Sequence, residues 1–209
     1  MLTPYVLPRT GELGPPVPVV VTPAGVRYAD PAQDQNWRDI DGTLWEVREG
    51  TPTGPPAYTA ELHPARQREA MEQLRCAGCY GPADRGPEGM LWLIPLLGAA
   101  PDSRWEGVRA AVPPMCAVCA DLAPRVCPVL REGHVTLRVR EAEPIGVLGT
   151  LHPRAGEPGP PDPDALIVYD SDALPFVVAR HAVRELRRVT VTSWQLHQTP
   201  ALPAPVRTT

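Results

Sequence analysis

Two Cys-X-X-Cys pairs constrain this chain more than any other feature of its sequence. They are Cys76 with Cys79 and Cys116 with Cys119, and they use four of the five cysteines. A tight turn can aim both thiolates of such a pair at one ion, and Zn²⁺ prefers four ligands in a tetrahedron. The spacing therefore predicts one closed structural Zn²⁺ site with no open position for a substrate.

The residues around the two pairs favour a particular kind of zinc site. Gly78 and Gly81 allow a tight backbone at the first pair, an apolar run follows it, and the second pair begins a predicted helix. This order resembles a treble-clef zinc finger. Three alternatives remain at this point: another metal or an iron–sulfur cluster, four buried cysteines without metal, and His134 as a ligand in place of one cysteine.

Cys127 and His134 are the other candidates for chemistry. Cys127 follows Cys119 by eight residues, and core packing is one interpretation. The other is a thiol nucleophile with His134 as its base. The chain has no His-X-Glu motif of the zinc deaminases and no phosphate-binding glycine loop. It has no lysine either, which excludes Schiff-base catalysis by a protein amine.

The charge of the chain bears on its partners. Its net charge is -4, and all 20 basic residues are arginine. Nucleic-acid binders usually carry a basic balance or a basic stripe, so the total argues mildly against DNA or RNA. Two predicted helices nevertheless carry arginine-rich faces, which are either solvated or offered to phosphates or an acidic partner. They are Arg66, Arg68 and Arg75 on the first, and Arg180, Arg184, Arg187 and Arg188 on the second.

The beginning of the chain contains no pattern of a signal peptide, and its longest aliphatic cluster at residues 17–21 is too short to span a membrane. We therefore expect a cytoplasmic protein without a membrane partner. Thiols stay reduced in the cytoplasm, so paired cysteines there more often bind metal than form disulfides.

The apolar pattern predicts an α+β fold in which a treble-clef-like zinc module joins a mixed or antiparallel sheet with packed helices. We expect a β-rich segment (residues 1–60), a helix with the zinc module (61–134), an α+β sheet subdomain (135–199) and a flexible tail (200–209). These parts could form one compact domain. Strands are expected on both sides of a turn at 23–25 and over 43–47, 89–97, 135–141, 145–152, 165–169 and 189–196. Helices are expected over 61–75, in two short pieces within 119–133, and over 175–188.

Several stretches between residues 63 and 190, among them "HPARQREAMEQLRCAGCYGPADR", "PPMCAVC" and "CPVLREGHVTLRVRE", resemble a family of uncharacterised proteins common in high-GC actinobacteria. The resemblance implies a shared fold and metal site, and Cys127 belongs to the same pattern. It implies no chemistry.

We expect a zinc-binding accessory protein that presents a surface to a protein or a nucleic acid, with a homodimer possible. The alternative is an enzyme, perhaps of specialised metabolism, with chemistry around Cys127 and His134 or in a pocket that the sequence does not reveal.

Overall fold

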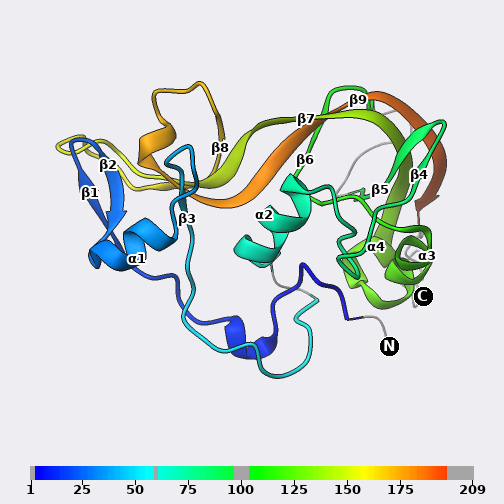
Figure 1. Ribbon diagram of the computed structural model, residues 1–209, viewed down its shortest axis with the longest axis horizontal. Helices are drawn as coiled ribbons and strands as arrows, with labels where there is room; N and C mark the ends of the chain where they lie inside the picture. The colour runs from blue at the N-terminus through cyan, green and yellow to red at the C-terminus, as the bar shows by residue number, and fades with distance from the viewer. Residues whose placement is uncertain (1–2, 59–60, 97–103, 197–209) are drawn as a thin grey trace, which may run out of the picture.

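The computed structural model describes residues 3–58, 61–96 and 104–196, so the predicted tail at 200–209 lies outside the described residues. Its architecture is α+β, as predicted: a mixed sheet of seven strands, a separate two-stranded sheet and short helices. In Figure 1, α3 and α4 lie at one end of the molecule, and α1 lies with β1 and β2 at the other end. The seven-stranded sheet takes strands from all three predicted segments and joins these ends.

Two long strands form the central pair of the sheet. β7 (Gly133–Leu151) and β9 (Val177–Leu196) are antiparallel partners from Gly133↔Leu196 to Leu151↔Val177. Figure 1 shows them running together as one curved ribbon across the molecule. The register shifts at three places, between Thr136 and Leu137, between Pro144 and Gly146, and between Leu148 and Gly149. Such bulges bend a strand pair, which explains the curvature.

The shorter strands extend this ribbon on both sides. β5 (Gly89–Pro95) and β8 (Asp162–Val168) are antiparallel to the two halves of β7, and β4 (Arg85–Gly86) forms a hairpin with β5. On the other side, β6 (Val108–Ala110) is antiparallel to β9, whereas β3 (Leu44–Trp45) is parallel to it. The separate sheet is the hairpin of β1 (Val19–Thr22) and β2 (Gly25–Tyr28), as the turn residues predicted.

The helices cover the sheet and its ends. They are α1 (Pro31–Asn36), α2 (Pro64–Glu72), α3 (Ala117–Val126) and α4 (Pro128–Glu132), with short 3₁₀ turns at Thr10–Glu12 and Leu174–Phe176. α2 is joined to β9 through Gln67, which is fully buried. The Gln67 side chain donates to the Ala182 carbonyl at 2.9 Å and accepts from the Ala182 amide at 2.9 Å. Among the described residues, no helix is both long and apolar enough to cross a membrane.

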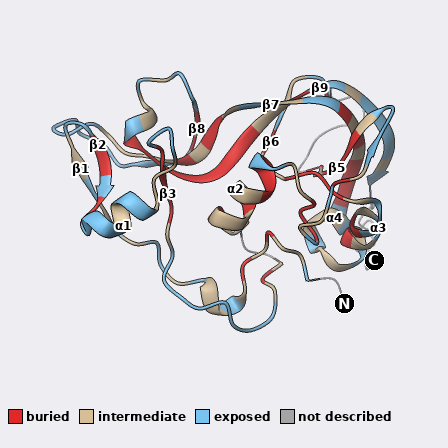
Figure 2. Cartoon of the chain, in the orientation of Figure 1, coloured by how far each residue is buried: buried red, intermediate tan, exposed pale blue. Residues whose placement is uncertain are grey.

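Buried residues run along β7 and β9 through the middle of the molecule (Figure 2). The largest apolar cluster contains Trp45, Trp92, Leu137 and Leu186, none of which is more than 1 % exposed. A second cluster surrounds the cysteines, and β5 separates the two, because Trp92 belongs to the first and Leu93 to the second. Both Cys-X-X-Cys pairs therefore contribute to a cluster that packs against the same strand as the main core.

The predicted helix over 175–188 is wrong, because most of this segment is the first half of β9. Every residue from Val177 to Val183 is buried, so both faces of the strand pack against protein. A strand buried on both faces loses its alternation of apolar and polar residues. Here Arg180 and His181 are buried too, and the apolar residues Phe176, Ala179, Val183 and Leu186 fall at helical spacing. The β-branched valines are the local feature that favours a strand.

Two strand predictions need a smaller correction. The stretches 135–141 and 145–152, expected as separate strands, form the single strand β7, and Pro144 lies at one of its bulges, where proline is tolerated. The run 89–97 ends as a strand at Pro95, and Leu97 lies outside the described residues. The helix at 61–75, which begins at Pro64, and the two short helices α3 and α4 are confirmed.

Candidate metal centre

The first cysteine turn, residues 75–82, follows α2 directly. Arg75 and Pro82 form an antiparallel bridge that closes it. Within the turn the Cys76 amide donates to the Gly81 carbonyl at 2.9 Å, and the Tyr80 amide donates to the Cys76 carbonyl at 2.8 Å. Gly78 is needed for space here, because a Cβ atom at this position would lie 2.7 Å from Cys119 Sγ.

The second pair lies at the beginning of α3. Cys116 is the residue that precedes the first helical turn, and its Sγ accepts a hydrogen bond from the Cys119 amide at 3.4 Å. The Ala120 amide donates to the Cys116 carbonyl at 2.9 Å, which starts the helix. Amide groups at the beginning of a helix favour negative charge, so this position suits thiolate ligands.

The fold brings the two pairs together. The four Sγ atoms lie within 4.8 Å of one another. Cys79 Sγ and Cys116 Sγ are 3.9 Å apart. Zinc–sulfur bonds of about 2.3 Å in a tetrahedron place the sulfur atoms about 3.8 Å apart. The four cysteines could therefore hold one metal ion, as the spacing predicted.

The environment of the sulfur atoms sets the protonation of the cluster. Burial raises the pKa of the Cys76 and Cys119 thiols. Burial acts in the same direction on Cys116, but hydrogen bonds from Cys119 and the neighbouring thiols outweigh it and lower the pKa of Cys116. Thiols must lose their protons to bind metal, so metal binding releases protons and weakens as the pH falls.

The first cysteine turn also organises the beginning of the chain. The Tyr5 amide donates to the Gly78 carbonyl at 2.8 Å, and the Val6 amide donates to the Ala77 carbonyl at 3.2 Å. The Ala77 amide in turn donates to the Pro114 carbonyl at 2.8 Å, just before the second pair. The turn thus connects three segments that are distant in sequence.

A cluster that the sequence did not reveal strengthens this junction. The Tyr5 and Tyr80 rings lie 4.4 Å apart, and both hydroxyl groups donate to the Glu69 carboxylate of α2, the Tyr80 hydroxyl at 2.7 Å. Burial raises the pKa of Tyr5 to about 12, so its hydroxyl stays protonated and remains a donor at neutral pH. The position of Tyr80 directly after Cys79 is the only sequence signal, and it does not identify the partner.

His134 and Cys127 lie outside the four-cysteine group. His134 is buried at the beginning of β7, and its Nδ1 atom lies 2.8 Å from the Leu130 carbonyl oxygen. Cys127 is half-buried at the junction of α3 and α4, where it lines an apolar cavity together with Leu130 and Met115. A catalytic role for either residue stays a prediction.

The predicted arginine-rich faces are rearranged by the fold. Arg66 makes an ion pair with Glu12 at 2.7 Å, and Arg68 makes one with Glu72 at 3.0 Å. The second face does not exist as a helix surface, because all four of its arginines lie on β9. Arg180, Arg184, Arg187 and Arg188 each bond to acidic side chains or backbone carbonyls of the protein.

Replacing Gly78 with alanine tests the geometry of the cluster directly. The new Cβ atom would lie 2.7 Å from Cys119 Sγ and 2.8 Å from Cys119 Cβ, so Cys119 must move out of ligand position. We expect weaker metal binding in a chelator competition and a loss of about 1–3 kcal/mol in the free energy of unfolding. Gly86→Ala is the matched control, because its Cβ would meet no atom within 4 Å. Equal metal affinity of the two variants would contradict the geometry.

No protein-family model, curated protein or solved structure matches the chain. The candidate metal centre is defined by the arrangement of Cys76, Cys79, Cys116 and Cys119.

Proposed function

We propose that the four cysteines bind one Zn²⁺ ion in a treble-clef arrangement, and that this ion is structural. The order of elements supports the proposal: the first cysteine turn, the hairpin of β4 and β5, and then α3 with the second pair at its beginning. The observation that carries it is the proximity of four sulfur atoms, which supply all four zinc ligands. A zinc ion saturated by thiolates has no position for a substrate or a reactive water.

The charge of the chain and the partners of its arginines support a role as an accessory protein that binds another protein. Nucleic-acid binding depends on cations that are free to neutralise phosphates. The net charge is -4, and Arg66, Arg180 and Arg184 are engaged with acidic groups or carbonyls of this chain. These features favour a protein partner over a nucleic acid.

We place the protein in the cytoplasm because its site requires reduced thiols. All five cysteines are free, and the Cys79 and Cys116 sulfur atoms are 3.9 Å apart, far beyond the length of a disulfide bond, about 2.05 Å. The alternative of an enzyme acting through Cys127 and His134 requires an accessible pair, whereas the His134 ring is buried against Leu130.

Cobalt substitution tests whether the metal is structural. The Co²⁺-loaded protein should show the absorption of a tetrahedral four-thiolate site, and added azide or imidazole should leave the spectrum unchanged. A spectrum that shifts with added ligand would mean an open coordination position, and the structural role would be wrong.

The partner class is tested by fluorescence anisotropy with labelled single- and double-stranded DNA and RNA at low salt. We expect no binding by the zinc-loaded protein. Binding that weakens steeply with added salt would instead establish a nucleic-acid partner.

A further inference from the structure

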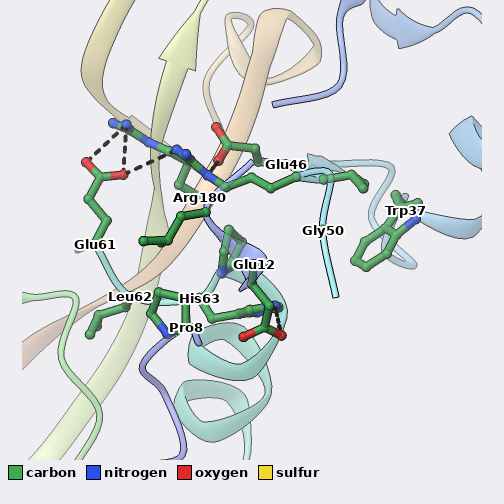
Figure 3. Close-up of a pocket in the computed structure, with 13 residues that line it drawn as sticks. Pro8, Glu12, Trp37, Glu46, Gly50, Glu61, Leu62, His63 and Arg180 are labelled. Carbon is green, nitrogen blue, oxygen red and sulfur yellow. Dashed lines mark hydrogen bonds and ion pairs between the residues drawn. The ribbon is translucent and has the colours of Figure 1, made fainter. Parts of the chain in front are cut away.

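A cavity of about 460 Å³, lined by both charged and apolar residues, lies apart from the four cysteines. It is formed where the N-terminal segment, the residues after β3, the beginning of α2 and β9 meet (Figure 3). Cavities of several hundred Å³ are typical of sites for small molecules. The sequence did not predict it, because its lining residues come from five separate parts of the chain.

One wall of the cavity is an irregular pair of segments, residues 8–17 and 47–57, which we call the N-terminal ribbon. The Ala57 amide donates to the Pro8 carbonyl at 2.9 Å, and the Val17 amide donates to the Val47 carbonyl at 2.8 Å. These hydrogen bonds keep the ribbon attached along its length, so the cavity is a built feature of the fold.

Charges of alternating sign continue from the ribbon along the cavity, in a series that we call the charged row. Arg48 Nε is 2.7 Å from Glu46 Oε1, and Arg48 Nη2 is 3.8 Å from Glu61 Oε2. Glu61 Oε1 is in turn 3.2 Å from Arg180 Nη1. Figure 3 shows Glu61 and Glu46 reaching toward these guanidinium groups from separate segments.

The burial of two members of the charged row is the unusual observation. Glu46 is 7 % exposed and Arg180 is 8 % exposed, whereas Arg48 and Glu61 are exposed. Buried ion pairs are costly to desolvate and are often no more stabilising than apolar residues of similar size. Charged groups buried beside a cavity are therefore candidates for ligand recognition.

The opposite side of the cavity offers no free base. Burial lowers the pKa of His63, which is consequently neutral at pH 7. Its Nδ1 atom accepts from the Arg66 amide at 3.5 Å, and its Nε2 atom faces Glu12 Oε1 at 3.5 Å. Because both ring nitrogens already have partners, the cavity suits binding better than proton transfer. Pro8, Leu62 and Pro64 add apolar surface on this side.

We propose that this cavity binds a small zwitterion of the α-amino-acid class. Glu12 is neutralised by Arg66, and the two carboxylates of the charged row are balanced by its two guanidinium groups. Arg180 makes a further ion pair, at 2.8 Å, with Asp164, an exposed residue outside the cavity lining. A ligand with one net charge would upset this balance in a partly desolvated site, whereas a zwitterion preserves it.

The spacing of the charges also supports an α-amino acid as the ligand. The ammonium and carboxylate groups of an α-amino acid are separated by one carbon atom, which suits a row whose opposite charges approach to 2.7 Å. Arg48 lines the cavity, and its Nη1 atom, which makes no ion pair or hydrogen bond with another described residue, would donate to the ligand carboxylate. Glu46 and Glu61 would accept from its ammonium group, and its aliphatic part would contact Leu62 and Pro64.

Calorimetric titration of the zinc-loaded protein with the neutral L-amino acids tests the proposal. We expect at least one to bind and to raise the melting temperature. For that amino acid, the analogue without its amino group and the analogue without its carboxylate should each bind about tenfold more weakly or not at all. The analogues are tested on the unchanged protein, so this comparison does not depend on any variant.

Two variants locate the site. Arg48→Gln and Glu46→Gln should each weaken binding about tenfold. Arg154→Gln, which removes an exposed ion pair with Asp172, should bind as the unchanged protein does. The proposal is overturned if no neutral amino acid binds, if a singly charged analogue binds equally well, or if both folded charged-row variants retain full affinity.

Discussion

Replacing Cys119 with serine should abolish tight metal binding and destabilise the part of the protein around α3 and the first cysteine turn. Cys119 is 3 % exposed and belongs to the apolar cluster that also contains Cys76 and Leu93. Structural zinc supplies about 10–16 kcal/mol of apparent folding free energy in isolated zinc-finger peptides. The larger core of this chain shares that role, so we expect a loss on the order of 5 kcal/mol in urea unfolding.

Cys127→Ser is the matched control, because Cys127 lies outside the four-cysteine group and is half-buried. It should retain one equivalent of zinc by elemental analysis and most of the stability. A Cys119→Ser protein with full zinc content and unchanged unfolding would show that the fourth sulfur is not a ligand.

Replacing Trp92 with alanine should cause the second large loss of stability. The loss should arise in the largest apolar cluster, and not in the cluster around the cysteines. Trp92 is fully buried on β5, directly opposite Leu137 on β7. Removing a buried tryptophan side chain lowers the free energy of unfolding by about 3–5 kcal/mol, because the protein loses the contacts of the ring and also contains a cavity in its place. Metal should still bind in the folded protein, because Leu93, and not Trp92, faces the cysteine cluster.

Trp92→Phe separates the packing of the ring from its polar group. The Trp92 indole N–H is buried without a hydrogen-bond partner among the described residues. Replacing it with a phenylalanine ring therefore breaks no hydrogen bond. We therefore expect Trp92→Phe to cost less than half as much as Trp92→Ala in chemical unfolding. Equal losses in the two variants, or an alanine variant as stable as the original chain, would contradict the position assigned to Trp92.

The parts of this fold that the sequence predicted are those determined by local chemistry. The turn at residues 23–25, the proline at the beginning of α2 and the break between α3 and α4 each follow from the conformational limits of glycine and proline. The four cysteines were recognisable for the same reason, since ligand spacing within each pair is a local property.

The parts that could not be predicted depend on contacts between distant segments. The first half of β9 was mistaken for a helix because burial on both of its faces removed the alternation that marks a strand. The charged row joins Glu61 to Arg180 across 119 positions, and neither residue stands out in its own segment. The contact between Tyr5 and Glu69 likewise arises only once the N-terminal segment meets the first cysteine turn.

Four sulfur atoms should converge on one ion and complete its coordination. X-ray absorption at the zinc edge of the purified protein measures the number and kind of atoms bound to the ion. Cys76, Cys79, Cys116 and Cys119 should give a first shell of four sulfur atoms at about 2.3 Å and no nitrogen or oxygen. Fewer sulfur atoms accompanied by a nitrogen or oxygen ligand, or a protein that takes up no zinc when zinc is supplied, would show that these four cysteines do not form a closed zinc site.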